Sequence, residues 1–190
     1  MEKSNKAVII INGRSGVGKD TLIEFAEAEF RVQNVSSIDR VKQIAQEAGW
    51  DGVKDARGRK LLIDIKQALV DYDDLPMKFM LEEVEKFFAS NNQILFIHIR
   101  EPHEILKLKN AINSSILLPS LEGAAPTGAG VVCDGVVKTL LITRDLGDNF
   151  YRHANDTGVL DFEYDLVFEN EKPIDESGKA FVSLLKTIIS

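Results

Sequence analysis

The sequence predicts an α/β fold in which helices cover both faces of a mostly parallel sheet. Short, β-branched apolar runs alternate with longer stretches whose apolar residues recur every three or four positions, as they do in helices. The first run, 7–12, passes through a glycine-rich turn into a helical pattern that includes Leu22, Ile23 and Ala26. Strands that alternate with helices pair in parallel, and such sheets are buried on both faces.

Each expected element has its own local signal. Five strands are predicted at 7–12, 35–38, 94–99, 136–143 and 164–168, where β-branched and aromatic residues cluster. Five further helices are predicted. One ends near Gly49, one includes 61–69, and the other three begin at Pro76, at Pro102 and near Ser177. Residues 113–132 and 144–161 have no apolar period and are predicted to be loops.

Composition restricts the class of protein. A chain of 190 residues fits a single domain, 1–190, and its net charge of −7 argues against nucleic acid or an anionic membrane as a partner. Its one cysteine, Cys133, allows no disulfide within the chain, as is usual in a reducing compartment. The polar start and the short first apolar run give no sign of a signal peptide or a membrane span, so a cytoplasmic location is expected.

One motif carries recognisable chemistry. It is G-x-x-x-x-G-K followed by Asp-Thr, and it consists of Gly13, Arg14, Ser15, Gly16, Val17, Gly18, Lys19, Asp20 and Thr21. The glycines let backbone N–H groups converge on phosphates, and the helix that follows adds a partial positive charge. Lys19 is positioned to follow a γ-phosphoryl group during transfer. The motif therefore predicts that the whole segment binds ATP, with Lys19 as a catalytic residue.

Asp20 stands where this motif usually has Ser or Thr, whose hydroxyl is a Mg²⁺ ligand. A carboxylate also binds Mg²⁺, directly or through water, so Asp20 is the predicted metal-binding residue. The alternative is an acidic residue that only interacts with the dipole at the helix N-terminus. Thr21 cannot simply replace it, because successive helical residues point about 100° apart.

With this motif the chain resembles the P-loop nucleoside and deoxynucleoside monophosphate kinases, and G-x-x-G-x-G-K-D-T is similar to the deoxynucleoside branch. The resemblance implies a three-layer P-loop NTPase fold, α/β/α, with a five-stranded parallel sheet of order 2-3-1-4-5. It also implies a helical acceptor-binding insert at 38–90 and a lid loop at 144–161. The sequence departs from the family at its third strand, where His98-Ile99-Arg100-Glu101-Pro102 replaces Asp-Gly-x-Pro-Arg.

The resemblance also suggests residues that bind the acceptor. They are Asp39 after the second strand, Arg57 and Arg59 (with Lys60) before the 61–69 helix, and Arg100 after the third strand. The carboxyl edge of a parallel sheet is where ligands gather, which favours a functional Arg100. Simpler alternatives remain for the others: a helix cap for Asp39, and a solvated helix start for the basic residues near 57–60.

Arginines of the predicted lid would stabilise charge on the transferring group. Arg144 follows the fourth strand, and Arg152 lies further along the loop beside His153, so Arg144 and Arg152 are predicted to be catalytic. His98 and Trp50 are more simply explained by packing than by ligand contact.

Three functions follow from these residues. The first is phosphoryl transfer from ATP·Mg²⁺ to a small phosphorylated acceptor, namely a nucleoside or deoxynucleoside monophosphate. The second is transfer to another phosphorylated metabolite, as in phosphomevalonate or dephospho-CoA kinases. The third, a nucleotide-dependent switch, ranks last, because no Asn-Lys-x-Asp-type base reader is found near Thr143-Arg144-Asp145.

Overall fold

The computed structural model describes residues 6–117, 135–147 and 158–190. Five strands form one sheet: β1 (Lys6–Asn12), β2 (Val32–Ser36), β3 (Ile94–His98), β4 (Gly135–Thr143) and β5 (Leu166–Glu169). All neighbours pair in parallel, in the order β2-β3-β1-β4-β5. This is the predicted strand order.

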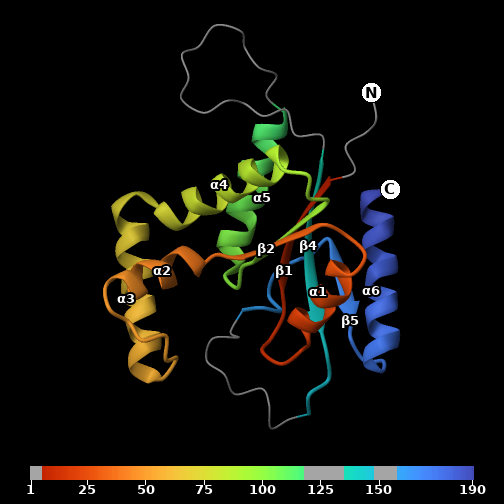
Figure 1. The fold of residues 1–190 in the computed structure, drawn as a ribbon, viewed down its shortest axis with the longest axis horizontal. Coiled ribbons are helices and arrows are strands. Elements are labelled where there is room, and N and C mark those ends of the chain that lie inside the picture. Colours follow the sequence, from red (N-terminus) through yellow and green to blue (C-terminus); the bar gives the residue numbers. More distant parts are fainter. Residues whose placement is uncertain (1–5, 118–134, 148–157) are drawn as a thin grey trace, which may run out of the picture.

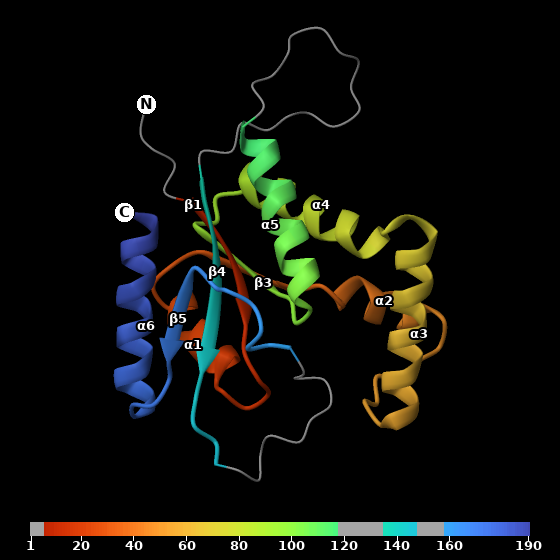
Figure 2. The ribbon, with the colours of Figure 1, turned by 180° about the vertical axis from the view of Figure 1, so that it is seen from behind.

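Six helices accompany the sheet in the described part of the chain. They are α1 (Lys19–Glu27), α2 (Asp39–Glu47), α3 (Ala56–Asp73), α4 (Leu75–Ala89), α5 (Pro102–Leu117) and α6 (Ile174–Ile189). Figure 1 shows α1 and α6 together on one side of the sheet and α4 and α5 on the other, with α2 and α3 projecting beyond the β2 edge; Figure 2 shows the same layers from behind.

Alternation along β1 explains the two faces. Ile9 and Ile11 pack with α1 and α6 around Phe181, whereas Val8 and Ile10 pack with α4 and α5. Successive side chains of a strand point to opposite faces, so an unbroken run of apolar residues buries both. Every residue from Ala7 to Ile11 is 0% exposed, as expected for the central strand.

Several predicted boundaries move in the structure. The predicted loop at 113–132 is wrong in its first part, because α5 continues to Leu117; the remainder lies outside the described residues. The last helix begins at Ile174 rather than near Ser177, after Pro173 as its N-cap residue. β2 begins at Val32, three residues before the expected run, because its half-buried edge position requires fewer apolar residues.

The segment 38–90 contains α2, α3 and α4, which have different packing partners. α4 packs on the sheet through Met77, Met80 and Phe87. α2 and α3 share a small separate cluster of buried Val41, Ala45 and Leu62. Within the described ranges, no helix combines the length and apolar character that crossing a membrane requires.

Candidate active site

The glycine-rich loop 13–18 connects the carboxyl end of β1 to the first turn of α1. Gly13 and Gly18 have φ angles of 148° and 86°, which side-chain-bearing residues rarely adopt. A Cβ atom on Gly13 would lie 2.5 Å from the carbonyl oxygen of Ile142, and one on Gly18 would lie 2.6 Å from Asn170 Nδ2. Both the backbone angle and the close neighbours therefore require glycine at these two positions.

Lys19 places its charge at this loop. Its Nζ donates hydrogen bonds to the carbonyl oxygens of Gly13 at 2.6 Å and Arg14 at 2.9 Å. α1 begins at Lys19 with Gly18 as its N-cap, so no side chain caps the helix. The first N–H groups of α1 and the Lys19 ammonium thus make the end of β1 attractive to an anion.

Asn12 links the loop to two neighbouring segments. It is 1% exposed, and its Oδ1 accepts a hydrogen bond from Gly13 N at 2.8 Å. Its Nδ2 donates to the carbonyl oxygen of Arg100 at 3.1 Å and to Tyr164 Oη at 2.7 Å. Tyr164 in turn donates to the carbonyl oxygen of Val159 at 2.9 Å. Burial raises the pKa of Tyr164 to about 12, against the opposing effect of the bond from Asn12, so the phenol stays a donor.

Asn170 holds the loop from the other side. Its side chain is buried, and its Nδ2 donates to the carbonyl oxygen of Val17 at 2.8 Å. Its backbone N–H donates to the carbonyl oxygen of Thr143 at 2.8 Å. The sequence analysis missed both Asn12 and Asn170. In the sequence, both could have been suspected because each is a polar residue at the end of an apolar run: Asn12 is the last residue of β1, and Asn170 directly follows β5.

The end of β3 meets charges from two helices. His98 is the last residue of β3, half-buried, and its Nε2 lies 2.9 Å from Asn34 Oδ1. Burial lowers the pKa of His98, because desolvation disfavours the charged imidazolium. Four charged groups act on it electrostatically, namely Asp20 and Lys19 of α1 and Asp39 and Lys42 of α2. The two carboxylates favour the charged form and the two ammonium groups oppose it, and burial is the largest influence.

Asp39, a predicted acceptor-side residue, and Trp50 both have local partners. The Asp39 carboxylate accepts from Ser36 N and from Lys42 Nζ, each at 2.7 Å. Asp39 is therefore held locally, but the predicted cap alternative is wrong: Asp39 is the first residue of α2, its N-cap residue is Ile38, and no side chain caps the helix. Trp50 packs in the α2–α3 cluster and donates to the carbonyl oxygen of Val53 at 3.2 Å, in agreement with the predicted packing role.

Four further arginines are exposed. Arg144 directly follows β4 and Arg100 lies two residues after β3, both at the same edge as loop 13–18. Arg57 lies in the first turn of α3, which Asp55 caps by accepting from Gly58 N at 2.7 Å. Arg59 follows one residue after Gly58. The first turns of α3 and the β1–α1 loop lie at the same end of the molecule (Figures 1 and 2). Arg152 and His153 lie outside the described residues.

A hollow of about 190 Å³ adjoins the loop. Its lining residues are Gly18, Thr21, Leu22, Arg144, Asn170, Lys172, Pro173 and Ile174. Complete ligand sites usually occupy about 300–1,000 Å³, so this hollow suits one part of a ligand whose phosphates extend to the loop.

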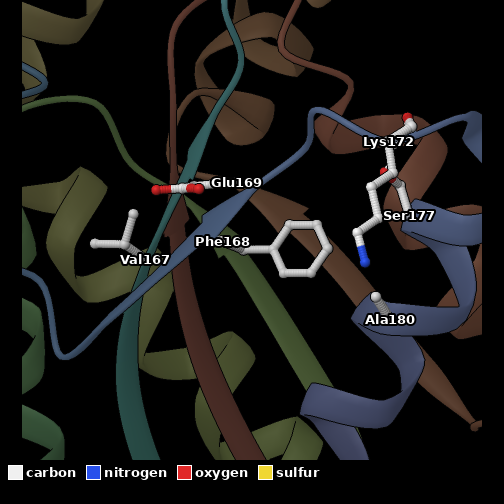
Figure 3. Close-up of a pocket in the computed structure, with 6 residues that line it drawn as sticks. All are labelled: Val167, Phe168, Glu169, Lys172, Ser177 and Ala180. Carbon is white, nitrogen blue, oxygen red and sulfur yellow. Dashed lines mark hydrogen bonds between the residues drawn. The ribbon is translucent and has the colours of Figure 1, made fainter.

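A larger hollow, of about 310 Å³, lies between β5 and α6. Figure 3 shows Phe168 pointing toward Lys172, Ser177 and Ala180, while Val167 and Glu169 point away from α6. No residue of loop 13–18 lines it. The smaller hollow is therefore the better candidate for the active site.

The strand order and the loop together define the fold class. A five-stranded parallel sheet of order 2-3-1-4-5, with G-x-x-x-x-G-K between its central strand and the next helix, is the P-loop NTPase fold. The three-layer α/β/α arrangement predicted from the sequence is thus confirmed.

The chain matches no protein-family model and no curated protein sequence. Among solved structures it is similar to a shikimate kinase from Aquifex aeolicus, with 12% identity, a TM-score of 0.43, and coverage of 94% of this chain and 96% of that one. It is also similar to a gluconokinase from Sinorhizobium meliloti, with 12% identity, a TM-score of 0.44, and coverage of 100% and 95%. At these scores the likeness is one of general arrangement, and the fold class stands on the topology and the loop themselves.

Proposed function

We propose that this protein is a kinase that transfers the γ-phosphoryl group of ATP to a small phosphorylated acceptor, with nucleoside or deoxynucleoside monophosphates as the acceptor class. The observation that carries the proposal is loop 13–18, whose glycines, Lys19 ammonium and uncapped α1 N-terminus converge at one edge of the sheet. Phosphoryl transfer is catalysed mainly by positioning and charge stabilisation, and these groups supply both.

The residues present suit ATP and magnesium. The loop offers backbone N–H groups and Lys19 to phosphates, and the adjoining hollow beside Arg144 suits the base. Mg²⁺ in such sites is held by one or two carboxylates together with substrate phosphates, a donor set that exposed Asp20 fits. When bound, ATP·Mg²⁺ supplies the transferable group and neutralises part of its charge. Lys19 and Arg144 would stabilise the charge that develops on that group.

The acceptor side is inferred from arginines. Arg57 and Arg59 are exposed and make no ion pair with any carboxylate of the described segments. Arg100 lies between β3 and α5, at the edge where the loop begins. A guanidinium binds a phosphate in a fork-like geometry that lysine cannot copy. These three positions therefore suit a monophosphate group in an otherwise acidic protein.

A second acceptor class has one observation in its favour. Asp39 is already bonded to Ser36 and Lys42, and Trp50 is packed between α2 and α3. The two side chains best suited to recognise a base are thus engaged elsewhere. A phosphorylated metabolite without a base, such as phosphomevalonate, would use the same arginines.

A coupled assay over all nucleoside and deoxynucleoside monophosphates, phosphomevalonate and dephospho-CoA tests this proposal. Turnover with at least one acceptor is expected, with strict dependence on ATP and Mg²⁺. Lys19→Ala should lower kcat by about 10²–10³-fold or more, as for other charge-stabilising groups, with an unchanged circular dichroism spectrum. A folded Lys19→Ala protein that keeps wild-type turnover would refute the kinase assignment.

A further inference from the structure

The α2–α3 pair has a small apolar cluster of its own. Its buried residues, Val41, Ala45 and Leu62, are packed by Ile38, Trp50, Ile65 and Leu69. None of these residues belongs to the two clusters that hold the helices on the sheet. The small cluster fixes α2 against α3, but other contacts must fix the pair against the sheet.

Lys66 makes such a contact from the middle of α3. Its Nζ donates to Glu101 Oε1 at 2.9 Å and to Glu104 at 3.0 Å. Glu101 lies just before α5, and Glu104 lies in its first turn. The side chains of Lys66 and Glu104 are only 16% and 14% exposed. An ion pair with so little exposure to solvent is screened much less than a surface pair, so the Lys66–Glu104 pair contributes to holding α3 in position.

The ionisation of the three groups is interdependent. Burial lowers the pKa of Lys66, but the bonds to both glutamates outweigh it and hold the pKa above its usual value. Burial would raise the pKa of Glu101, but the bond to Lys66 outweighs it and holds this pKa below its usual value. The pKa of Glu104 is raised, because burial and the charge of Glu101 outweigh the effect of Lys66. Removing the lysine would leave the mostly buried carboxyl group of Glu104 beside the partly exposed one of Glu101 without a cation between them, which is costly.

The contact leads directly to loop 13–18. Glu101 follows Arg100, whose carbonyl oxygen accepts from Asn12 Nδ2 at 3.1 Å. Asn12 Oδ1 accepts from Gly13 N at 2.8 Å. A short series of bonds thus runs from the middle of α3 to the first residue of the loop. Arg57 and Arg59 lie two turns or so earlier on the same helix, at about 1.5 Å of rise per residue.

We propose that Lys66 is a positioning residue for the acceptor: by holding α3 against Glu101 and Glu104, it sets where Arg57 and Arg59 stand relative to the phosphate-binding loop. The acceptor role rests on the proposed kinase function. The holding of α3 does not, because it depends only on the ion pairs and the packing described above.

The test compares Lys66→Met with a matched control on the same helix. Gln67→Met removes an i,i+4 hydrogen bond of 2.7 Å from Gln67 Nε2 to Asp71 Oδ1, between exposed side chains of α3 that have no proposed role in binding. Lys66→Met should raise the acceptor KM by about 10-fold or more, since small misplacements of binding groups have large kinetic effects. Its kcat and its affinity for ATP, titrated without acceptor, should stay within about threefold of wild type. Lys66→Arg, which keeps the cation, should restore most of the lost acceptor affinity.

Two readouts need no catalysis. Amide hydrogen exchange in 56–73 should be faster in Lys66→Met than in Gln67→Met, and the fluorescence of Trp50, the single tryptophan, should change only in the former. Equal exchange in the two variants would overturn the proposal. An acceptor KM no higher than that of Gln67→Met, or parallel losses in ATP affinity and kcat, would overturn it as well.

Failure of the proposed function gives a different pattern. If wild-type protein phosphorylates none of the acceptors, the kinase assignment fails, and the acceptor role of Lys66 fails with it. Exchange and fluorescence then still decide whether Lys66 holds α3.

Discussion

Asn170→Ala should destabilise the whole domain through one lost hydrogen bond. Asn170 Nδ2 donates to the carbonyl oxygen of Val17 at 2.8 Å, and the side chain is only 5% exposed. Alanine leaves that carbonyl without its donor, and an unsatisfied buried polar group costs about 1–3 kcal/mol. For a protein of this size, each kcal/mol lowers Tm by about 2–4 °C. The expected fall in Tm is therefore about 2–12 °C.

Loss of the same bond should also weaken nucleotide binding. Val17 and Gly18 belong to the loop proposed to hold the phosphates, and Asn170 lies against both. If ordering the loop when ATP binds costs about 1–1.4 kcal/mol of free energy, the Kd for ATP rises about 5–10-fold. Isothermal titration with ATP·Mg²⁺, without acceptor, measures this directly. The two effects share one cause, so they should occur together.

Two variants control this experiment. Asn170→Asp keeps the shape but replaces the donor with a carboxylate oxygen, so it should be at least as destabilised as Asn170→Ala. Asn110→Ala changes an exposed asparagine of α5 and should shift Tm by little. If Asn170→Ala melts at the temperature of Asn110→Ala, the asparagine does not hold the loop.

Three further predictions address other groups. Burial would raise the pKa of Asp165, but bonds from Lys109 and from both donors of Thr139 outweigh it and hold the pKa below its usual value. The resulting stability is present above the unfolded-state pKa of about 3.9 and is lost as pH falls through the lower folded-state value, so Asp165→Asn should lower Tm at pH 7 and much less at pH 2. An equal loss at both pH values would contradict this. Asp20→Ala should raise the Mg²⁺ concentration needed for half-maximal turnover, and Asp20→Ser should restore part of it; wild-type Mg²⁺ dependence in both variants would leave Asp20 only a dipole partner. Arg100→Met should raise acceptor KM with kcat nearly unchanged, whereas Arg144→Met should lower kcat and kcat/KM together by about 10²–10³-fold. The reverse pattern would show that the acceptor and lid assignments are exchanged.

The central strands and the loop could be predicted because their signals are local. A β-branched run, a glycine-rich turn and a helical stripe follow one another within 7–30, and each is recognisable from its own sequence pattern. The C-terminal end of α5 could not be predicted, because Asn113, Ser114 and Ser115 interrupt the apolar period. The helix nevertheless continues to Leu117. Composition there resembles a loop, but tertiary context overrides weak propensity.

The polar groups that support the site could not be found in this way. Asn12 binds Tyr164, 152 positions later, and Lys66 binds Glu101 across 35 positions. No period or motif marks such pairs, because each forms only when the sheet order brings two segments together. Types of residue at a strand end can suggest them, as Asn12 does, but the partner is a property of the fold.

These supporting groups hold the loop and the α2–α3 pair in different ways. Loop 13–18 is held by buried asparagines on two sides, next to a strand that is fully excluded from solvent. The α2–α3 pair has a small core of its own, and its contacts with α4 and α5 include Arg40 over Phe79, Asp74 with Lys107, and Lys66 with Glu101 and Glu104. The loop is thus held through buried amide groups, whereas these contacts of the α2–α3 pair depend on charged side chains. In the proposed kinase, the loop would position the transferred group and α3 would position the acceptor through Arg57 and Arg59. Lys66 acts at the point where these two parts meet, because Glu101 directly follows Arg100, whose carbonyl oxygen is bonded to Asn12 beside the loop.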